Sequence, residues 1–162
     1  MFRILGGVAL AALLSGSASA QDLKFKPGED ARFNWKSYDD FAAAHKLEGQ
    51  SLTIFGPWRG EDQALVESML AYFSAATGIK VAYSSSENYE QQIVIDTQAG
   101  SPPDIAILPQ PGLISDLASK GLLTDLGADT ATWLKDNYAA GDSWVKLGTY
   151  KGKDGADALY AF

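Results

Sequence analysis

Three short apolar runs alternate with three amphipathic stretches between residues 51 and 121. The apolar runs have the length and β-prone composition of strands and lie at residues 51–55, 79–83 and 102–109. The amphipathic stretches repeat apolar residues at spacings of three and four, as helices do, and lie at residues 63–77, 89–99 and 113–118. Strands that alternate with helix-length connections predict an α/β fold with a mostly parallel sheet and flanking helices.

The third apolar run is continuous and is bracketed by Pro102 and Pro109. An apolar run without polar alternation predicts a strand buried on both faces, as in the middle of a parallel sheet. Gly78, Gly100 and Gly121 follow the three helical stretches. We expect these glycines to end the helices, because glycine readily adopts the left-handed conformation found at helix termini.

The segment before the first strand, residues 21–49, is predicted to be an N-terminal extension with one short helix. Ser37 and Asp40 have the spacing of a capping box and would begin that helix, which would end near Gly49. His45, the single histidine, lies in this helix without the neighbouring ligands or bases that a catalytic or metal-binding histidine needs. We therefore favour a plain helix-surface role for it.

The pattern weakens after residue 123. Asp129 is expected to cap a short helix that runs to Tyr138. Residues 143–150 and 158–162 resemble strands on either side of the turn-rich segment KGKDG. Residues 50–162 therefore read as a partial α/β lobe that is apparently truncated, since no closing helix or polar tail follows the last apolar segment.

The first 20 residues have the features of a secretory signal peptide. Arg3 precedes an apolar run at residues 4–14, and Ala18 and Ala20 supply the small residues of a cleavage site. No later segment approaches the roughly 20 apolar residues of a membrane helix. The chain has no cysteine, which excludes disulfides and a lipid-anchored cysteine. These features predict an exported protein without direct membrane insertion.

Composition and charge limit the kinds of partner that the protein can bind. A hydrophobic fraction of 46% with 20% charged residues is ordinary for a globular domain. The formal net charge is −7, and lysines and arginines do not cluster. Without a basic patch we expect no nucleic-acid partner, and without a basic amphipathic stretch we expect no membrane-surface binding.

The loop after the first strand carries the residues that most suggest a binding site. The strand stops at Gly56 and Pro57, and polar and aromatic side chains precede the helix. Ligands of open α/β sheets bind outside the carboxyl ends of the strands. The candidate residues in this loop are Trp58, Arg59, Glu61 and Asp62. The ends of the second and third strands add Ser85, Ser86 and Gln110.

Four segments, taken in order, resemble the amino-terminal lobe of family 1 extracellular solute-binding proteins, the mostly carbohydrate-binding components of ATP-driven importers. They read LTIFGPWRGEDQ (52–63), FSAATGIKV (73–81), SPPDIAILPQPG (101–112) and LLTDL (122–126). The segment FNWKSYDDFAAA (33–44), together with IFGPW, is similar to the α-glucoside-binding members. The resemblance covers nearly all of the chain after the signal peptide but less than half of a complete member.

The resemblance implies a periplasmic-binding-protein-like (type II) N-terminal lobe in a monomeric periplasmic protein. Complete members have a second lobe, and the two lobes close on a small-molecule carbohydrate like a hinge. It further implies that the closed protein contacts the membrane permease subunits of the importer and needs no cofactor or metal. The sugar expected from the finer similarity is an α-glucoside.

Sugar chemistry gives each candidate residue a role. Trp58 would stack on the apolar C–H face of a sugar ring, because a rigid aromatic loses little entropy when it is ordered. Arg59, Glu61 and Asp62 would hold hydroxyl groups through charge-assisted hydrogen bonds. The three residues at the other strand ends would complete the rim.

Structural interpretations compete with these roles. We favour Asp62 as a cap of the following helix, and Glu61 shares that alternative. Trp58 would alternatively pack against the second lobe. Asn88 is expected to cap its own helix, and Tyr89 has packing and binding as equal alternatives. The remaining tryptophans, to which we assign structural roles, are Trp35, Trp133 and Trp144.

Catalysis is the least favoured class. Glu61 and Asp62 are adjacent in sequence, whereas a glycosidase needs two carboxyl groups facing each other across the substrate. The sequence has no GxSxG or HExxH motif, and GPWRGED places bulky residues where a phosphate-binding loop needs small ones. The alternatives that remain are a binder of another solute (a polyamine or a metal chelate), a nonfunctional or interaction-only fragment and, last, a secreted glycoside hydrolase.

Overall fold

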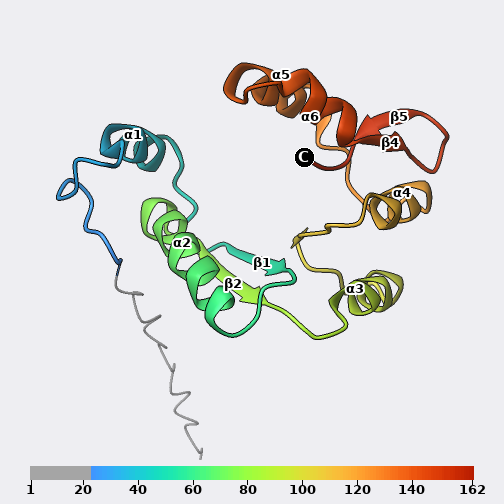
Figure 1. Ribbon diagram of the computed structural model, residues 1–162, viewed down its shortest axis with the longest axis horizontal. Helices are drawn as coiled ribbons and strands as arrows, with labels where there is room; N and C mark the ends of the chain where they lie inside the picture. The colour runs from blue at the N-terminus through green and yellow to red at the C-terminus, as the bar shows by residue number, and fades with distance from the viewer. Residues whose placement is uncertain (1–22) are drawn as a thin grey trace, which may run out of the picture.

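A computed structural model describes residues 23–162, and the predicted signal peptide lies outside the described residues. The helices are α1 (Trp35–Ala44), α2 (Glu61–Thr77), α3 (Tyr89–Gln98), α4 (Pro111–Ser119), α5 (Gly127–Asn137) and α6 (Gly141–Leu147) (Figure 1). The strands are β1 (Ser51–Phe55), β2 (Lys80–Ser84), β3 (Ile105–Ala106), β4 (Thr149–Lys151) and β5 (Asp157–Leu159). None of the helices between residues 23 and 162 combines the length and apolarity that crossing a bilayer requires.

A three-stranded parallel sheet in the order β2-β1-β3 organises the first part of the structure. Ser51 is paired with Lys80 and Phe55 with Ser84, so β1 and β2 run in full register, and Ile54 is paired with Ile105 of β3. Helix α2 connects β1 to β2 and packs against β2. This arrangement confirms the predicted α/β class and parallel sheet. All three strands therefore end at one edge.

The third strand differs from its prediction. Only two residues of the apolar run form β3, and Ile105 is 44% exposed, so the strand is not buried on both faces. The reason is that β3 pairs with β1 alone and borders a cavity of about 560 Å³ on its other side. The residues that line this cavity come from α3, residues 102–108 around β3, α4, and residues 122–126 and 160–162.

The buried core lies between the sheet and helices α3 and α4. Phe55, Tyr89 and Ile93 form its centre, and the side chains packed around them are Val94, Ala106, Leu108 and Leu113. Leu117 and Ala118 of α4 are fully buried. The core thus anchors the end of β1, from which the candidate binding loop begins.

The last part of the chain gathers around the β4–β5 hairpin, and β4 contacts α4 (Figure 1). The hairpin confirms the predicted turn at KGKDG. The strand predicted over residues 143–150 is wrong in its first half, because residues 141–147 form helix α6. Asp142 in the first turn and Lys146 in the last turn both favour a helix.

Two predicted helix caps are also wrong. Helix α1 begins after Asn34, whose Oδ1 accepts a hydrogen bond from the Ser37 N–H at 3.2 Å, so Asn34 and not Ser37 is the cap. Helix α5 begins at Gly127, which places Asp129 inside its first turn. Asn88 does precede α3 as predicted, although its side chain makes no capping hydrogen bond.

Tyr72 of α2 makes two hydrogen bonds to the N-terminal extension. The hydroxyl of Tyr72 accepts a hydrogen bond from the Phe25 N–H at 2.7 Å and donates to the Phe25 carbonyl at 2.9 Å. The rings of Trp35 and Tyr38 lie 6.2 and 6.4 Å from the Tyr72 ring. The extension therefore packs along the helix that follows the candidate loop.

Candidate functional site

The candidate binding loop, residues 56–60, connects β1 to α2 at the carboxyl edge of the sheet. The Gly56 N–H donates to the Ser84 carbonyl at 3.1 Å, which continues the pairing of β1 and β2 by one residue. Gly60 has a φ of 60° and precedes the first residue of α2. The side chain of Trp58 is 39% exposed. The loop thus presents an accessible aromatic ring between two fixed ends.

Tyr83 holds the middle of this loop, although no sequence motif singles it out. Its hydroxyl accepts a hydrogen bond from the Trp58 N–H at 2.9 Å and donates one to the Trp58 carbonyl at 3.1 Å. Tyr83 lies on β2, next to the strand that leads into the loop. An alternating strand pattern identifies which residues share a face, but it does not reveal a partner 25 residues away.

Close packing explains the glycine at the start of the loop. A Cβ atom on Gly56 would lie 2.9 Å from the Tyr83 hydroxyl oxygen and 3.2 Å from Cδ1 of Ile107. Gly56 is buried, and a Cβ contact under 3.0 Å would force one of these atoms to shift. The ends of all three strands therefore meet at a position where only glycine fits without a shift.

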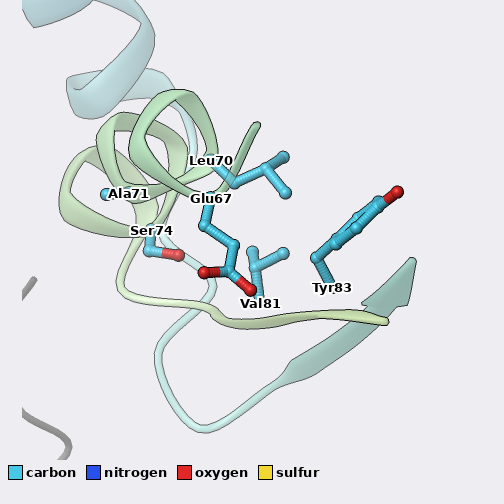
Figure 2. A pocket seen from close by; sticks show the side chains of 6 residues that line it. All are labelled: Glu67, Leu70, Ala71, Ser74, Val81 and Tyr83. Carbon is cyan, nitrogen blue, oxygen red and sulfur yellow. The ribbon is translucent and has the colours of Figure 1, made fainter. Parts of the chain in front are cut away.

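The Tyr83 ring also borders a small pocket of about 30 Å³ between α2 and β2 (Figure 2). Its hydroxyl points away from Glu67, which comes from α2 (Figure 2). The pKa of Tyr83 is raised above its usual value. Burial raises this pKa, the hydrogen bond with Trp58 lowers it, and the Glu67 carboxylate raises it. The hydroxyl is consequently protonated at neutral pH and able to donate to Trp58.

Arg59 contacts a carboxylate from the neighbouring strand end. Its Nη1 lies 3.0 Å from Oε1 of Glu87, in the segment between β2 and α3. Both side chains are largely exposed, so this ion pair contributes at most about 1 kcal/mol to stability. It nevertheless brings a cation and an anion together beside Trp58. Glu87 was not among the predicted site residues.

Glu61 and Asp62 are the first two residues of α2 and are both exposed. The capping role favoured for Asp62 is wrong, because Gly60 occupies the cap position and no side chain bonds there. A glycine with positive φ lets the chain enter the helix without a capping side chain. Both carboxylates still complement the positive end of the helix dipole.

The remaining predicted residues occupy the same edge of the sheet. Ser85 and Ser86 follow β2 directly, and the Ser86 Oγ is buried without a hydrogen-bond partner among residues 23–162. Gln110 is exposed and lies at the start of α4, where its carbonyl accepts hydrogen bonds from Leu113 and Ile114. In the described structure no hydrogen bond joins Gln110 to the Trp58 loop.

Other residues weighed from the sequence lie outside this group. His45 is exposed and its ring lies 4.3 Å from that of Phe41. Tyr89 belongs to the buried core. Trp133 and Trp144 are about half exposed and flank Tyr138, with ring separations of 5.7 and 6.3 Å. Within the described residues no cluster of histidine, cysteine or carboxylate side chains could hold a metal ion.

The Trp58 loop lies at the carboxyl edge of the parallel sheet, which is where open α/β sheets bind their ligands. The sequence profile of bacterial extracellular solute-binding proteins matches residues 56–159, and the chain belongs to this family. This confirms the family resemblance predicted from the four sequence segments.

Two relatives narrow the comparison. Over an alignment that covers 98% of its length, the chain is 69% identical to the alpha-glucosides-binding periplasmic protein AglE of Rhizobium meliloti (strain 1021). It is 36% identical over 103 residues, or 64% of its length, to the osmoprotective compounds-binding protein GgtB of Synechocystis sp. (strain ATCC 27184 / PCC 6803 / Kazusa). It spans 36% of the length of AglE and 24% of the length of GgtB.

Proposed function

We propose that this chain supplies the amino-terminal wall of a periplasmic carbohydrate-binding protein that serves an ATP-dependent importer. The observation that carries the proposal is the 69% identity to AglE over 98% of the chain. The ligand class is an oligosaccharide with α-glucosidic linkages. The partners are the membrane permease subunits of the importer, and the protein is not an enzyme.

The candidate residues divide into three roles in this proposal. The exposed ring of Trp58 stacks on a sugar face. Arg59, with Glu87 beside it, exchanges hydrogen bonds with sugar hydroxyls, since both charged groups are accessible to a ligand. Peripheral contacts come from Glu61, Asp62, Ser85, Ser86 and Gln110 at the same edge of the sheet. A second lobe then closes over the bound sugar.

A chimera tests this proposal in a complete family member. Residues 23–162 replace the aligned part of AglE, and the melting temperature of the chimera is measured with maltose, trehalose and a panel of osmoprotective solutes. A ligand at 100 times its Kd stabilises the protein by about 2.7 kcal/mol, which raises the melting temperature by several degrees. Trp58→Ala should abolish the shift, and Trp133→Ala serves as the matched control.

The panel also decides the ligand class. A shift with either α-glucoside supports the proposal. A shift with an osmoprotective solute alone would transfer the assignment to the ligand class named for GgtB. No shift with any compound would refute binding by this wall.

A further inference from the structure

The main chain of Trp58 is held by a single side chain. In the described structure the hydrogen bonds of the Trp58 N–H and of the Trp58 carbonyl both go to the Tyr83 hydroxyl. A hydroxyl group donates one hydrogen bond while it accepts another, so one oxygen satisfies both groups. Phenylalanine at position 83 could make neither hydrogen bond, and lysine could donate but not accept.

We propose that Tyr83 is a positioning residue that fixes the backbone of Trp58 and thereby sets where the indole ring meets its ligand. The ligand part of this inference rests on the proposed function, whereas the positioning part does not. The Trp58 carbonyl already takes the one proton that the Tyr83 hydroxyl can donate, so Tyr83 acts on a ligand through Trp58. Because Tyr83 already orders the loop, the loop loses less conformational entropy when a sugar binds.

Gly56 allows Tyr83 to reach Trp58. Its missing Cβ leaves the space that the Tyr83 hydroxyl needs to reach Trp58, since a Cβ there would lie 2.9 Å from that oxygen. Gly56→Ala should therefore displace the hydroxyl and loosen the loop. Once Tyr83→Phe has removed the hydroxyl, Gly56→Ala should have a smaller effect. The two substitutions are thus expected to be non-additive, as contacting residues are.

The first experiment uses residues 23–162 without any sugar. Tyr83→Phe removes one oxygen atom and keeps the ring. We expect the Trp58 amide to exchange its hydrogen at least tenfold faster and the Trp58 indole signal in NMR spectra to narrow. The chain has four tryptophans, so Trp58→Phe assigns that signal. Tyr89→Phe is the control, because in the described structure the Tyr89 hydroxyl lies 3.5 Å from Oε1 of Glu90 and makes no hydrogen bond to the loop's main chain.

The second experiment measures sugar binding in the AglE chimera. Tyr83→Phe should raise the Kd about tenfold while the melting temperature of the sugar-free chimera changes little, because both hydrogen bonds to Trp58 are exposed to solvent. Unchanged exchange at Trp58, or equal effects of Tyr83→Phe and Tyr89→Phe, would overturn the inference. If the parent chimera binds no sugar, the proposed function fails, and the exchange measurement still decides the role of Tyr83.

Discussion

Thr53 and Asp104 join β1 to the start of β3 through three hydrogen bonds. One carboxylate oxygen of Asp104 accepts from the Thr53 N–H and from the Thr53 hydroxyl, each at 2.7 Å. The Thr53 hydroxyl oxygen in turn accepts from the Asp104 N–H at 3.0 Å. The two residues therefore replace part of the strand pairing that the short β3 lacks.

This arrangement predicts a pH-dependent contribution to stability. The hydrogen bonds from the Thr53 side chain and backbone hold the pKa of Asp104 below its usual value of 3.8. Because the folded state favours the ionised form, the contribution is complete above pH 3.8 and is lost as the pH falls through the folded-state pKa. Urea unfolding at several pH values gives the free energy of unfolding of the parent chain and of Asp104→Asn. The difference between the two should shrink as the pH falls below 3.8. A constant difference would contradict it.

Core packing around α3 gives a second prediction. Ile93 is 1% exposed in the centre of the core, whereas Ile95 on the same helix is 57% exposed. Ile93→Ala should lower the free energy of unfolding by about 2 to 5 kcal/mol, because it removes buried atoms and leaves a cavity. Ile95→Ala is the matched control and should change it by about 0.5 kcal/mol or less. Equal losses would mean that α3 is packed differently.

The attachment of the N-terminal extension gives a third prediction. Tyr72→Phe removes both hydrogen bonds to Phe25 and should lower the free energy of unfolding by about 1 to 2 kcal/mol. Limited proteolysis should then cut the extension faster than in the parent chain. Tyr38→Phe is the control, because the Tyr38 ring packs beside Tyr72 without a hydrogen bond from its hydroxyl in the described structure. Unchanged cleavage would show that packing alone holds the extension.

The open side of β3 gives a fourth prediction. An unpaired strand edge beside an apolar cavity invites edge-to-edge association, so residues 23–162 should self-associate at high concentration. Ile105→Lys should suppress the association, since a lysine on an edge strand opposes pairing with a second edge. Light scattering measures this effect. Ile95→Lys adds the same charge on an exposed helix position, and equal suppression by it would assign the effect to net charge.

Much of the fold could be predicted from the sequence because the strands and helices alternate and their apolar residues keep the expected periods. Strand β1 matches its predicted limits, and Gly78 and Gly121 end their helices with positive φ as expected. The first residues of the helices were harder to predict. Asn34, Ser37 and Asp40 offer overlapping cap patterns, and only three-dimensional geometry decides which side chain reaches a free N–H.

The sequence predicts at which edge of the sheet the candidate residues lie, but not which side chains contact them. The order of strands places Trp58 and Arg59 at the carboxyl edge, which follows from parallel topology. Tyr83 and Glu87 become relevant only through contacts between neighbouring strand ends. The burial of residues 102–109 was overestimated, because a continuous apolar run does not reveal how many strands lie beside it.

The hold of Tyr83 on Trp58 uses only backbone atoms of residue 58, and these atoms are common to every amino acid except proline, which lacks the N–H. The loop geometry is therefore independent of the side chain that it displays. Position 58 is consequently suited to directed evolution: a library of aromatic and polar residues there would sample new ligand preferences while the scaffold stays intact.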